Sequence, residues 1–214
     1  MVRTTEQEAA RIRNQKLIRT HAANRPYPFV LIVADDTNYG IEIAREIRNI
    51  GFRPKVISPP DNNLYTEIAE ARGLGYRNIA LYGQGRGADQ VLSVAAHVPG
   101  YFGVVAEDPI YSDQCIGHTL IQMLGDNPTQ RLFSPSFILH NEEGYALTIT
   151  EELGRILVRE KECNLKAEVW QESMPRSKPQ YLAEIFEGFN NQRIEQENTP
   201  KDYSIRQLTL LMSA

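Results

Sequence analysis

Cysteine is scarce in this sequence, and long apolar runs are missing altogether. The 214 residues include only two cysteines, Cys115 and Cys163, which are far apart in the chain. They indicate neither a disulfide framework nor a cysteine zinc site, so we expect free thiols. No stretch approaches the length of a membrane-spanning helix, and the charged first twenty residues lack the apolar core of a signal peptide. We therefore expect a cytoplasmic protein without membrane insertion.

Basic residues are also fewer than acidic ones, with 23 Lys and Arg against 27 Asp and Glu. The formal net charge is −4 at pH 7, whereas a general nucleic-acid-binding protein presents a basic surface. We therefore expect no nucleic-acid partner. The acidic residues Asp35, Asp36, Glu107 and Asp108 could gather around a divalent cation. Roles as helix caps and helix-dipole partners are favoured instead, and we predict neither a metal ion nor a cofactor.

The chain divides into three parts. Residues 1–25 form a charged, helix-favouring arm, residues 26–192 form one globular domain, and residues 193–214 form an extension with an apolar tail. A hydrophobic content of 42% suits a domain of this size with a full core. An apolar tail needs a groove, either on its own domain or on a partner. The candidate partner-binding side chains in the tail are Ile205, Leu208, Leu211 and Met212.

Strand and helix patterns alternate through the domain. Thr37 or Asn38 is predicted to cap the first helix and Gly51 to end it, while Ser177 and Gln180 have the spacing of a capping box. Further helices are expected after Ser112 and Thr148. Parallel strands joined by right-handed helical crossovers form a doubly wound α/β sheet, which is a three-layer α/β/α sandwich. Six mostly parallel strands are predicted, at residues 29–34, 53–58, 78–83, 101–107, 136–141 and 165–170.

A turn with alternating glycines, LYGQGRGADQ at residues 81–90, leads from the third strand into a helix. In a nucleophile elbow, small residues surround the nucleophile because the strand-to-helix turn leaves no room for side chains. Gly83, Gly85 and Gly87 meet this steric demand. Glycine amides at a helix N-terminus could also cradle a phosphate beside Arg86, but tight packing is the favoured explanation.

The stretch NIALYGQGRGADQVLSVAAHVPGYFGVVAEDP (78–109) resembles the elbow segment of the α/β-hydrolase family. SFILHNEEGYALT (136–148) looks like the strand and loop that carry the family's catalytic acid. LKAEVWQESMPRSKPQYLAEIFEGF (165–189) is similar to its last strand, histidine loop and final helix. The resemblance covers residues 26–190 and implies an α/β-hydrolase-like fold.

The catalytic positions implied by this resemblance hold other residues. Gly85 stands in place of the nucleophile, and the acid position falls near Gly144, beside Glu142 and Glu143. The histidine loop contains no histidine, and His140 is the only histidine expected at the active-site edge. Acyl transfer needs an activated nucleophile and a base. We therefore predict a catalytically degenerate member of this fold.

A second resemblance covers VISPPDNNLYTEIAEARGLGYRNIALYGQGRGADQ (56–90) and GVVAEDPIYSDQCIGHTLIQM (103–123), which are similar in layout to the aminoimidazole ribonucleotide carboxylase/mutase family. Its two histidines would fall at Pro60 and Asp89, and its phosphate-binding serines at Asp35 and Thr37. Both families share the strand order 2-1-3-4-5. The sixth strand and the final helix favour the hydrolase resemblance.

Two main hypotheses about function follow. The first is a non-catalytic interaction or assembly subunit, with a protein partner or a second copy of the chain. The second is a small-molecule or nucleotide binder, or an enzyme without a triad, that uses the crevice at the carboxyl ends of the strands. A residual esterase is a third, weaker hypothesis. The candidate ligand-binding residues are Asp35, Asp36, Gly85, Arg86, Glu107 and His140.

Overall fold

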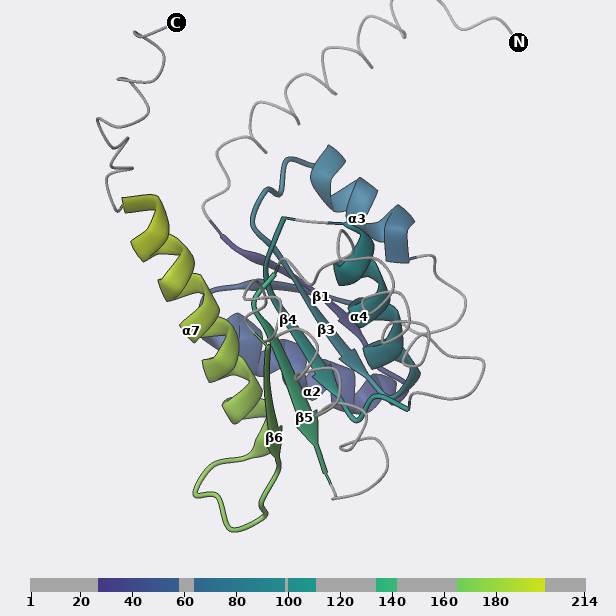
Figure 1. The fold of residues 1–214 in the computed structure, drawn as a ribbon, viewed down its shortest axis with the longest axis vertical. Coiled ribbons are helices and arrows are strands. Elements are labelled where there is room, and N and C mark those ends of the chain that lie inside the picture. Colours follow the sequence, from purple (N-terminus) through teal and green to yellow (C-terminus); the bar gives the residue numbers. More distant parts are fainter. Residues whose placement is uncertain (1–26, 58–63, 99, 111–133, 142–164, 199–214) are drawn as a thin grey trace, which may run out of the picture.

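A computed structural model of the protein describes residues 27–57, 64–98, 100–110, 134–141 and 165–198. Within these residues, six parallel strands form one sheet in the order β2-β1-β3-β4-β5-β6 (Figure 1). The six predicted strands are thereby confirmed. They are β1 (Phe29–Val33), β2 (Arg53–Ile57), β3 (Ile79–Gln84), β4 (Tyr101–Glu107), β5 (Ser136–His140) and β6 (Leu165–Val169).

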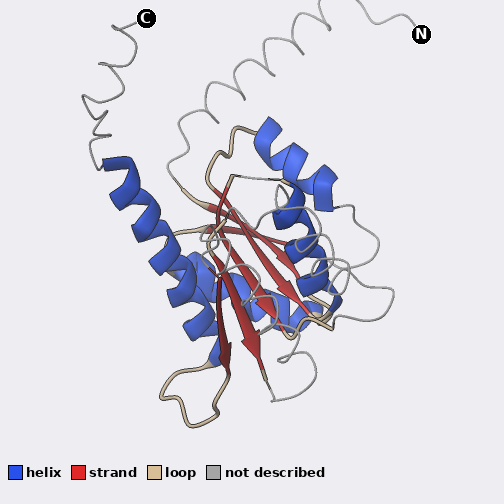
Figure 2. Cartoon of the chain, in the orientation of Figure 1, coloured by secondary structure: helices blue, strands red, loops and turns tan. Residues whose placement is uncertain are grey.

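Helices cover both faces of the sheet (Figure 2). Side chains of α2 and α7 pack with one face, and side chains of α3 and α4 pack with the other. This arrangement is the predicted three-layer α/β/α sandwich. The described helices are α2 (Thr37–Asn49), α3 (Leu64–Gly73), α4 (Arg86–His97) and α7 (Lys178–Asn198).

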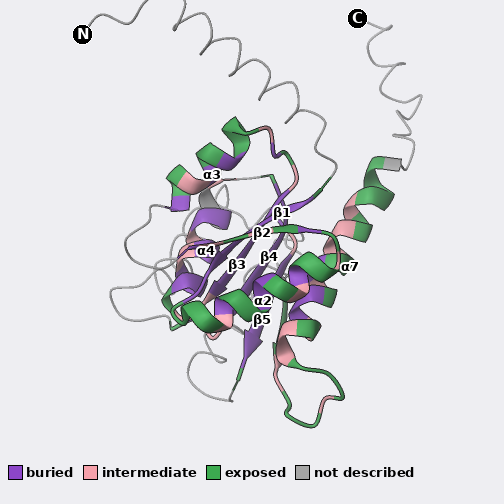
Figure 3. Cartoon of the chain, turned by 180° about the vertical axis from the view of Figure 1, so that it is seen from behind, coloured by how far each residue is buried: buried purple, intermediate pink, exposed green. Residues whose placement is uncertain are grey.

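The central strands supply the core because both of their faces are covered. Every residue of β1, β4 and β5 is buried, and Figure 3 shows these strands behind helices whose outer sides are exposed. Successive side chains point to opposite faces, so Leu31 and Leu81 pack toward α4 while Ile32 and Tyr82 pack toward α2 and α7. The continuous apolar runs thus reflect two-sided burial.

The ends of the helices differ in one respect from prediction. The N-cap of α2 is Asp36, whose carboxylate accepts hydrogen bonds from the backbone N–H groups of Asn38 and Tyr39. The prediction of Thr37 or Asn38 as this cap was wrong, because Thr37 is already the first helical residue. At the other end, Gly51 has φ 86°, the left-handed conformation expected at a helix stop.

The last described helix has the predicted start. The backbone N–H of Ser177 donates to the Gln180 side chain at 3.3 Å, which is half of a capping box. The helix continues to Asn198 and so passes the expected domain boundary at residue 192. The helices expected after Ser112 and Thr148, residues 1–25 and the tail beyond 198 lie outside the described residues. No helix among the described residues combines the length and apolar character that crossing a membrane requires.

Candidate functional site at the carboxyl edge of the sheet

The glycine turn has the backbone geometry of a tight strand-to-helix elbow. Gly85 ends the turn as the N-cap of α4, with φ 59° and ψ −119°. This conformation is strained for any residue with a side chain. The N–H of Gly85 donates to the backbone carbonyl of Glu107 at 2.9 Å, which fastens the turn to the end of the neighbouring strand β4.

The flanking glycines are required by packing. A Cβ on Gly83 would lie 2.2 Å from the carbonyl oxygen of Gly87, and a Cβ on Gly87 would lie 2.1 Å from the carbonyl oxygen of Val33. Backbone atoms cannot yield to such contacts. The steric account of Gly83 and Gly87 is therefore confirmed.

The carboxylate of Asp35, directly after β1, reaches across to this elbow. A Cβ on Gly85 would come 2.5 Å from Asp35 Oδ2. The same oxygen accepts a hydrogen bond from the backbone N–H of Arg86 at 3.1 Å, and Oδ1 accepts one from Arg86 Nε at 3.3 Å. In a working nucleophile elbow, the N–H after the nucleophile belongs to the oxyanion hole. Here that N–H is bound to a carboxylate of the chain itself.

The other acidic candidates have separate roles. Asp36 caps α2, while Asp108, which has φ 47°, accepts hydrogen bonds from the backbone N–H of Asn141 at 2.6 Å and from the Asn141 side chain. Glu107 points into a different cluster, described below. The parts of the chain that the structure describes contain no group of three or more metal-ligating side chains arranged to hold an ion.

Glu107, at the end of β4, is a fully buried carboxylate. Its oxygens accept hydrogen bonds from the hydroxyl of Tyr39 at 3.1 and 3.2 Å and from the hydroxyl of Tyr82. Lys178 Nζ lies 3.0 Å from Glu107 Oε1 and also donates to the Asn141 side chain. The carboxylate thus joins β3, β4, α2 and α7 at one point, and a positive charge balances it.

Two aromatic rings complete the surroundings of this lysine. Lys178 Nζ lies 6.0 Å from the centre of the Tyr39 ring and 5.8 Å from that of Trp170. Both distances fall within the range of cation–π attraction. The Lys178 side chain is 20% exposed, so the ammonium group is largely enclosed by a carboxylate, an amide oxygen and two rings.

Burial changes the acidity of the groups around this cluster. Burial first, and then the charge of Glu107, raises the pKa of Tyr39 and of Tyr82 far above the usual value of a phenol. Both hydroxyls therefore remain donors to Glu107 at neutral pH. Burial lowers the pKa of His140, and the nearby charge of Asp108 partly opposes this effect. His140 ends β5 as predicted and is 2% exposed.

Sequence reasoning found only part of this edge. Among the candidate residues, the structure brings Asp35 to Gly85 and Arg86, but it places Glu107 in a separate cluster with residues that were not predicted: Tyr39, Tyr82, Asn141 and Lys178. One feature of the sequence could have identified Lys178 as a site residue: it lies in the loop ESMPRSKPQ (172–180), where the resemblance places a histidine. Whether any of the candidates binds a ligand stays a prediction.

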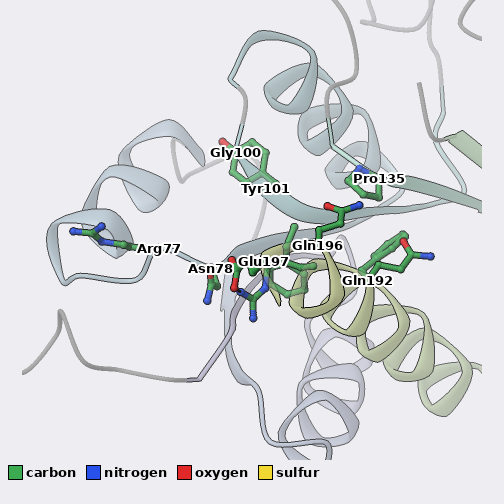
Figure 4. Close-up of a pocket in the computed structure, with 11 residues that line it drawn as sticks. Arg77, Asn78, Gly100, Tyr101, Pro135, Gln192, Gln196 and Glu197 are labelled. Carbon is green, nitrogen blue, oxygen red and sulfur yellow. Dashed lines mark hydrogen bonds and ion pairs between the residues drawn. The ribbon is translucent and has the colours of Figure 1, made fainter. Parts of the chain in front are cut away.

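Two cavities lined by described residues lie at the opposite edge of the sheet. One of about 320 Å³ is bounded by the starts of β3 and β4 and by the last turns of α7; in Figure 4, Gln192 and Gln196 approach it from the helix, and Tyr101 and Pro135 lie across from them. Another of about 480 Å³ lies beside Arg53 at the start of β2. Arg193, in the wall of the first, is bound to Glu197 and Asn190.

Comparison with known proteins supports the fold assignment. No family model matches the chain, and no curated protein matches it. Among solved structures, a protein described as a dienelactone hydrolase from Klebsiella pneumoniae is similar over 78% of this chain and 88% of its own, with a TM-score of 0.56 and 12% identity. An esterase from Pyrococcus furiosus is similar over 77% of this chain and 83% of its own, with a TM-score of 0.53 and 13% identity. This chain has an α/β-hydrolase-like fold.

Proposed function

We propose that this chain is a non-catalytic protein of α/β-hydrolase-like fold that acts as an interaction or assembly subunit. The observation that carries the proposal is the Asp35 carboxylate, which is hydrogen-bonded to the N–H of Arg86 beside a residue without a side chain, Gly85. Its competitor is an enzyme that transfers acyl groups, as the names of the similar structures suggest for those proteins.

This elbow lacks three features that acyl transfer requires: a nucleophile, a base and a free N–H group for the oxyanion. Gly85 offers no nucleophile, and the loop at residues 172–180 offers no histidine to activate one. A carboxylate already accepts the hydrogen bond that an oxyanion would need, and its charge repels the negative charge that develops in the transition state. One missing group can be replaced by other chemistry, but the joint loss of all three favours a chain that does not catalyse this reaction.

The other polar groups at the edge are also bound within the protein. Asp36 serves as a helix cap, and Asp108 accepts hydrogen bonds from the backbone N–H and the side chain of Asn141. Groups in such contacts must give up good partners before they can bind a substrate. This internal pairing supports the interaction role over the alternative role in which these carboxylates bind a small molecule or a nucleotide.

The proposed contact elements are the two ends of the chain. The arm at residues 1–25 is charged, and the tail carries the apolar side chains Ile205, Leu208, Leu211 and Met212. An apolar segment of this kind is stabilised by a hydrophobic groove. We propose that a protein partner or a second copy of the chain provides it.

Two measurements test the proposal together. The first follows hydrolysis of an activated ester by the full chain, and we expect turnover no faster than with an Asp35→Ala variant or with buffer. The second compares the full chain with a Leu208→Asp/Leu211→Asp variant by light scattering and by capture of its complex from the source cells. We expect the variant to lose the assembly, while Thr209→Asp, which adds a charge to the same segment, retains most of it.

A truncation would complement the point variants. It should end at Asn198 and not at residue 192, because Arg193 bonds to Asn190 and Glu197 within α7. Saturable ester hydrolysis at the rate of an ordinary esterase would refute the non-catalytic proposal. An assembly that survives both the truncation and the leucine substitutions would refute the role of the tail.

A further inference from the structure

The surroundings of Lys178 form a defined binding site for a positive charge. The ammonium cage, as we name it, consists of Glu107, Asn141, Tyr39 and Trp170. Glu107 Oε1 is 3.0 Å from Lys178 Nζ, and the two ring centres are at 6.0 and 5.8 Å. The members come from β4, the end of β5, α2 and the residue after β6, so the sheet and its helices position the cage without Lys178.

A cation in this cage is strongly favoured. Glu107 has no exposed surface, and a buried carboxylate without a counter-charge is costly. The two tyrosine hydroxyls satisfy part of its hydrogen-bonding capacity, but they carry no charge. The aromatic faces add attraction for an ammonium group that has left water. A cation therefore stabilises the ionised form of the cage, and nothing in the geometry of the cage requires that the cation be part of the chain.

We propose that the cage is a binding site for a primary alkylammonium group, and that Lys178 is its exchangeable occupant. Lys178 is the first residue of α7 and follows residues 171–177, most of which are exposed. Its side chain is 20% exposed, whereas that of Glu107 has no exposed surface. The ammonium group can therefore withdraw through rotation of its own side chain, and the strands that hold Glu107 and Asn141 remain in place.

The hydrogen bonds specify a primary ammonium. Lys178 Nζ donates to Glu107 and to the Asn141 oxygen at the same time, and a quaternary ammonium has no N–H with which to do so. Aromatic rings alone would bind primary and quaternary ammonium groups alike. The expected ligand is thus an amine such as a lysine side chain or a small alkylamine, with quaternary ammonium ions bound more weakly.

The chain carries its own reporter for this site. Trp170 is the only tryptophan in the sequence and one wall of the cage. In Lys178→Ala, n-propylammonium supplies the atoms that the substitution removes beyond Cβ. We expect Trp170 fluorescence of this variant to change saturably as n-propylammonium chloride is added, with a rise in melting temperature. Sodium chloride at equal ionic strength and tetramethylammonium chloride should have smaller effects.

Wild type and Lys166→Ala are the matched controls. Lys166 is an exposed lysine on β6, so its removal leaves the cage filled. Because the tethered Lys178 competes at an effective concentration in the millimolar range or above, both should respond at least about tenfold more weakly than Lys178→Ala. The test uses neither end of the chain, so its result is independent of the proposed assembly role.

The possible outcomes decide the proposal. A saturable response in Lys178→Ala that exceeds the response of Lys166→Ala supports it, and equal responses of the two variants overturn it. A response to tetramethylammonium as strong as that to n-propylammonium overturns the assignment to primary amines. Should Lys178→Ala be unfolded alone, recovery of its circular dichroism with n-propylammonium supports the site, and failure to recover overturns it.

Discussion

The carboxylate of Asp35 occupies the space into which a side chain on Gly85 would project. Oδ2 lies 2.5 Å from the position of a Cβ on Gly85, and it holds the Arg86 N–H in a hydrogen bond of 3.1 Å. A residue 50 positions earlier in the sequence thus fills the corner where a hydrolase of this fold carries its reactive group. Introducing a serine at this corner would meet both a strained backbone and an occupied site.

The variant Gly85→Ser should therefore be less stable, and under the proposed non-catalytic role it should gain no esterase activity. The φ of 59° costs a residue with a side chain about 1–3 kcal/mol, and the serine must also displace Asp35. We expect the free energy of unfolding to fall by about 2 kcal/mol, measured by urea denaturation, with no gain in hydrolysis of an activated ester. The double variant Asp35→Ala/Gly85→Ser should recover part of the stability and remain inactive. Measurable acyl transfer by either variant would contradict our account of the site.

The pair of Glu107 and Lys178 should be coupled in a double-mutant cycle. Removal of one partner from a buried ion pair typically costs about 3–5 kcal/mol because the other charge is left without compensation. We expect a loss of this order in Lys178→Met, which leaves Glu107 buried without a counter-charge, and a smaller loss in Glu107→Gln, because the 20% exposed Lys178 side chain can turn to solvent. The double variant should lose less than the sum of the two. Urea denaturation of the four proteins measures the coupling.

An exposed pair near the start of the same helix provides the comparison. Arg176 and Glu184 form an ion pair whose side chains are 43% and 47% exposed, so their coupling should stay below about 1 kcal/mol. If both pairs gave the same coupling, burial of Glu107 would not be the source of the effect.

Alanine substitutions at two glycines should change the free energy of unfolding in opposite directions. Gly188 lies in α7, and apart from its chain neighbours and the backbone of the same helix, no atom of the described residues lies within 4 Å of the position that an alanine methyl group would take there. Gly188→Ala should therefore raise the free energy of unfolding by about 0.5–1 kcal/mol. Gly103 lies in β4, where a Cβ would be 2.2 Å from the ring of Phe189. Gly103→Ala should lower the free energy of unfolding by about 1–3 kcal/mol, because α7 must shift to make room for the methyl group. Thermal unfolding measures both, and a stabilising Gly103→Ala would show that α7 packs differently on β4.

Alkaline pH should unfold the protein through its tyrosines. Burial and the charge of Glu107 raise the pKa of Tyr39 and Tyr82, and burial with a hydrogen bond to Glu168 raises that of Tyr181 to about 12. The unfolded chain releases these protons near pH 10, while the folded chain retains them. Stability is thus fully present below about pH 10 and is lost as the pH rises above it.

Urea midpoints between about pH 8 and pH 11 measure this loss. Tyr39→Phe removes one of these ionisable hydroxyls. The urea midpoint of this variant should therefore decline less steeply with pH than that of the wild type. A parallel decline in the two proteins would show that Tyr39 ionises in the folded state much as it does in the unfolded chain.

The fold was largely predictable because the sequence patterns that indicate its strands and its glycine turn are local. Strands β1, β3, β4 and β5 are short apolar runs between turn residues, and burial on both faces makes this pattern recognisable without knowledge of the neighbouring strands. The edge strands β2 and β6 carry charged residues and are partly exposed. The elbow was visible for the same reason, since its three glycines alternate within five residues. The cap of α2 was misplaced by one or two residues because Asp36, Thr37 and Asn38 all have capping side chains.

The candidate site was less predictable because its contacts join distant residues. Lys178 and Glu107 are 71 positions apart, and Tyr39 and Glu107 are 68 apart. Neither lysine nor tyrosine at such positions differs in sequence from an ordinary surface or core residue. Asp35 was recognised as a polar residue after a strand, but its approach to Arg86 depends on how β1 and β3 lie side by side.

The alternating glycines have a consequence for motif searches. Gly83 and Gly87 are fixed by the distance at which α4 crosses the backbone of β1 and β3, and that distance would be the same with or without a reactive group between them. A search for this spacing therefore detects how closely a helix and a strand approach, and chemical competence has to be read from the side chains that surround the turn.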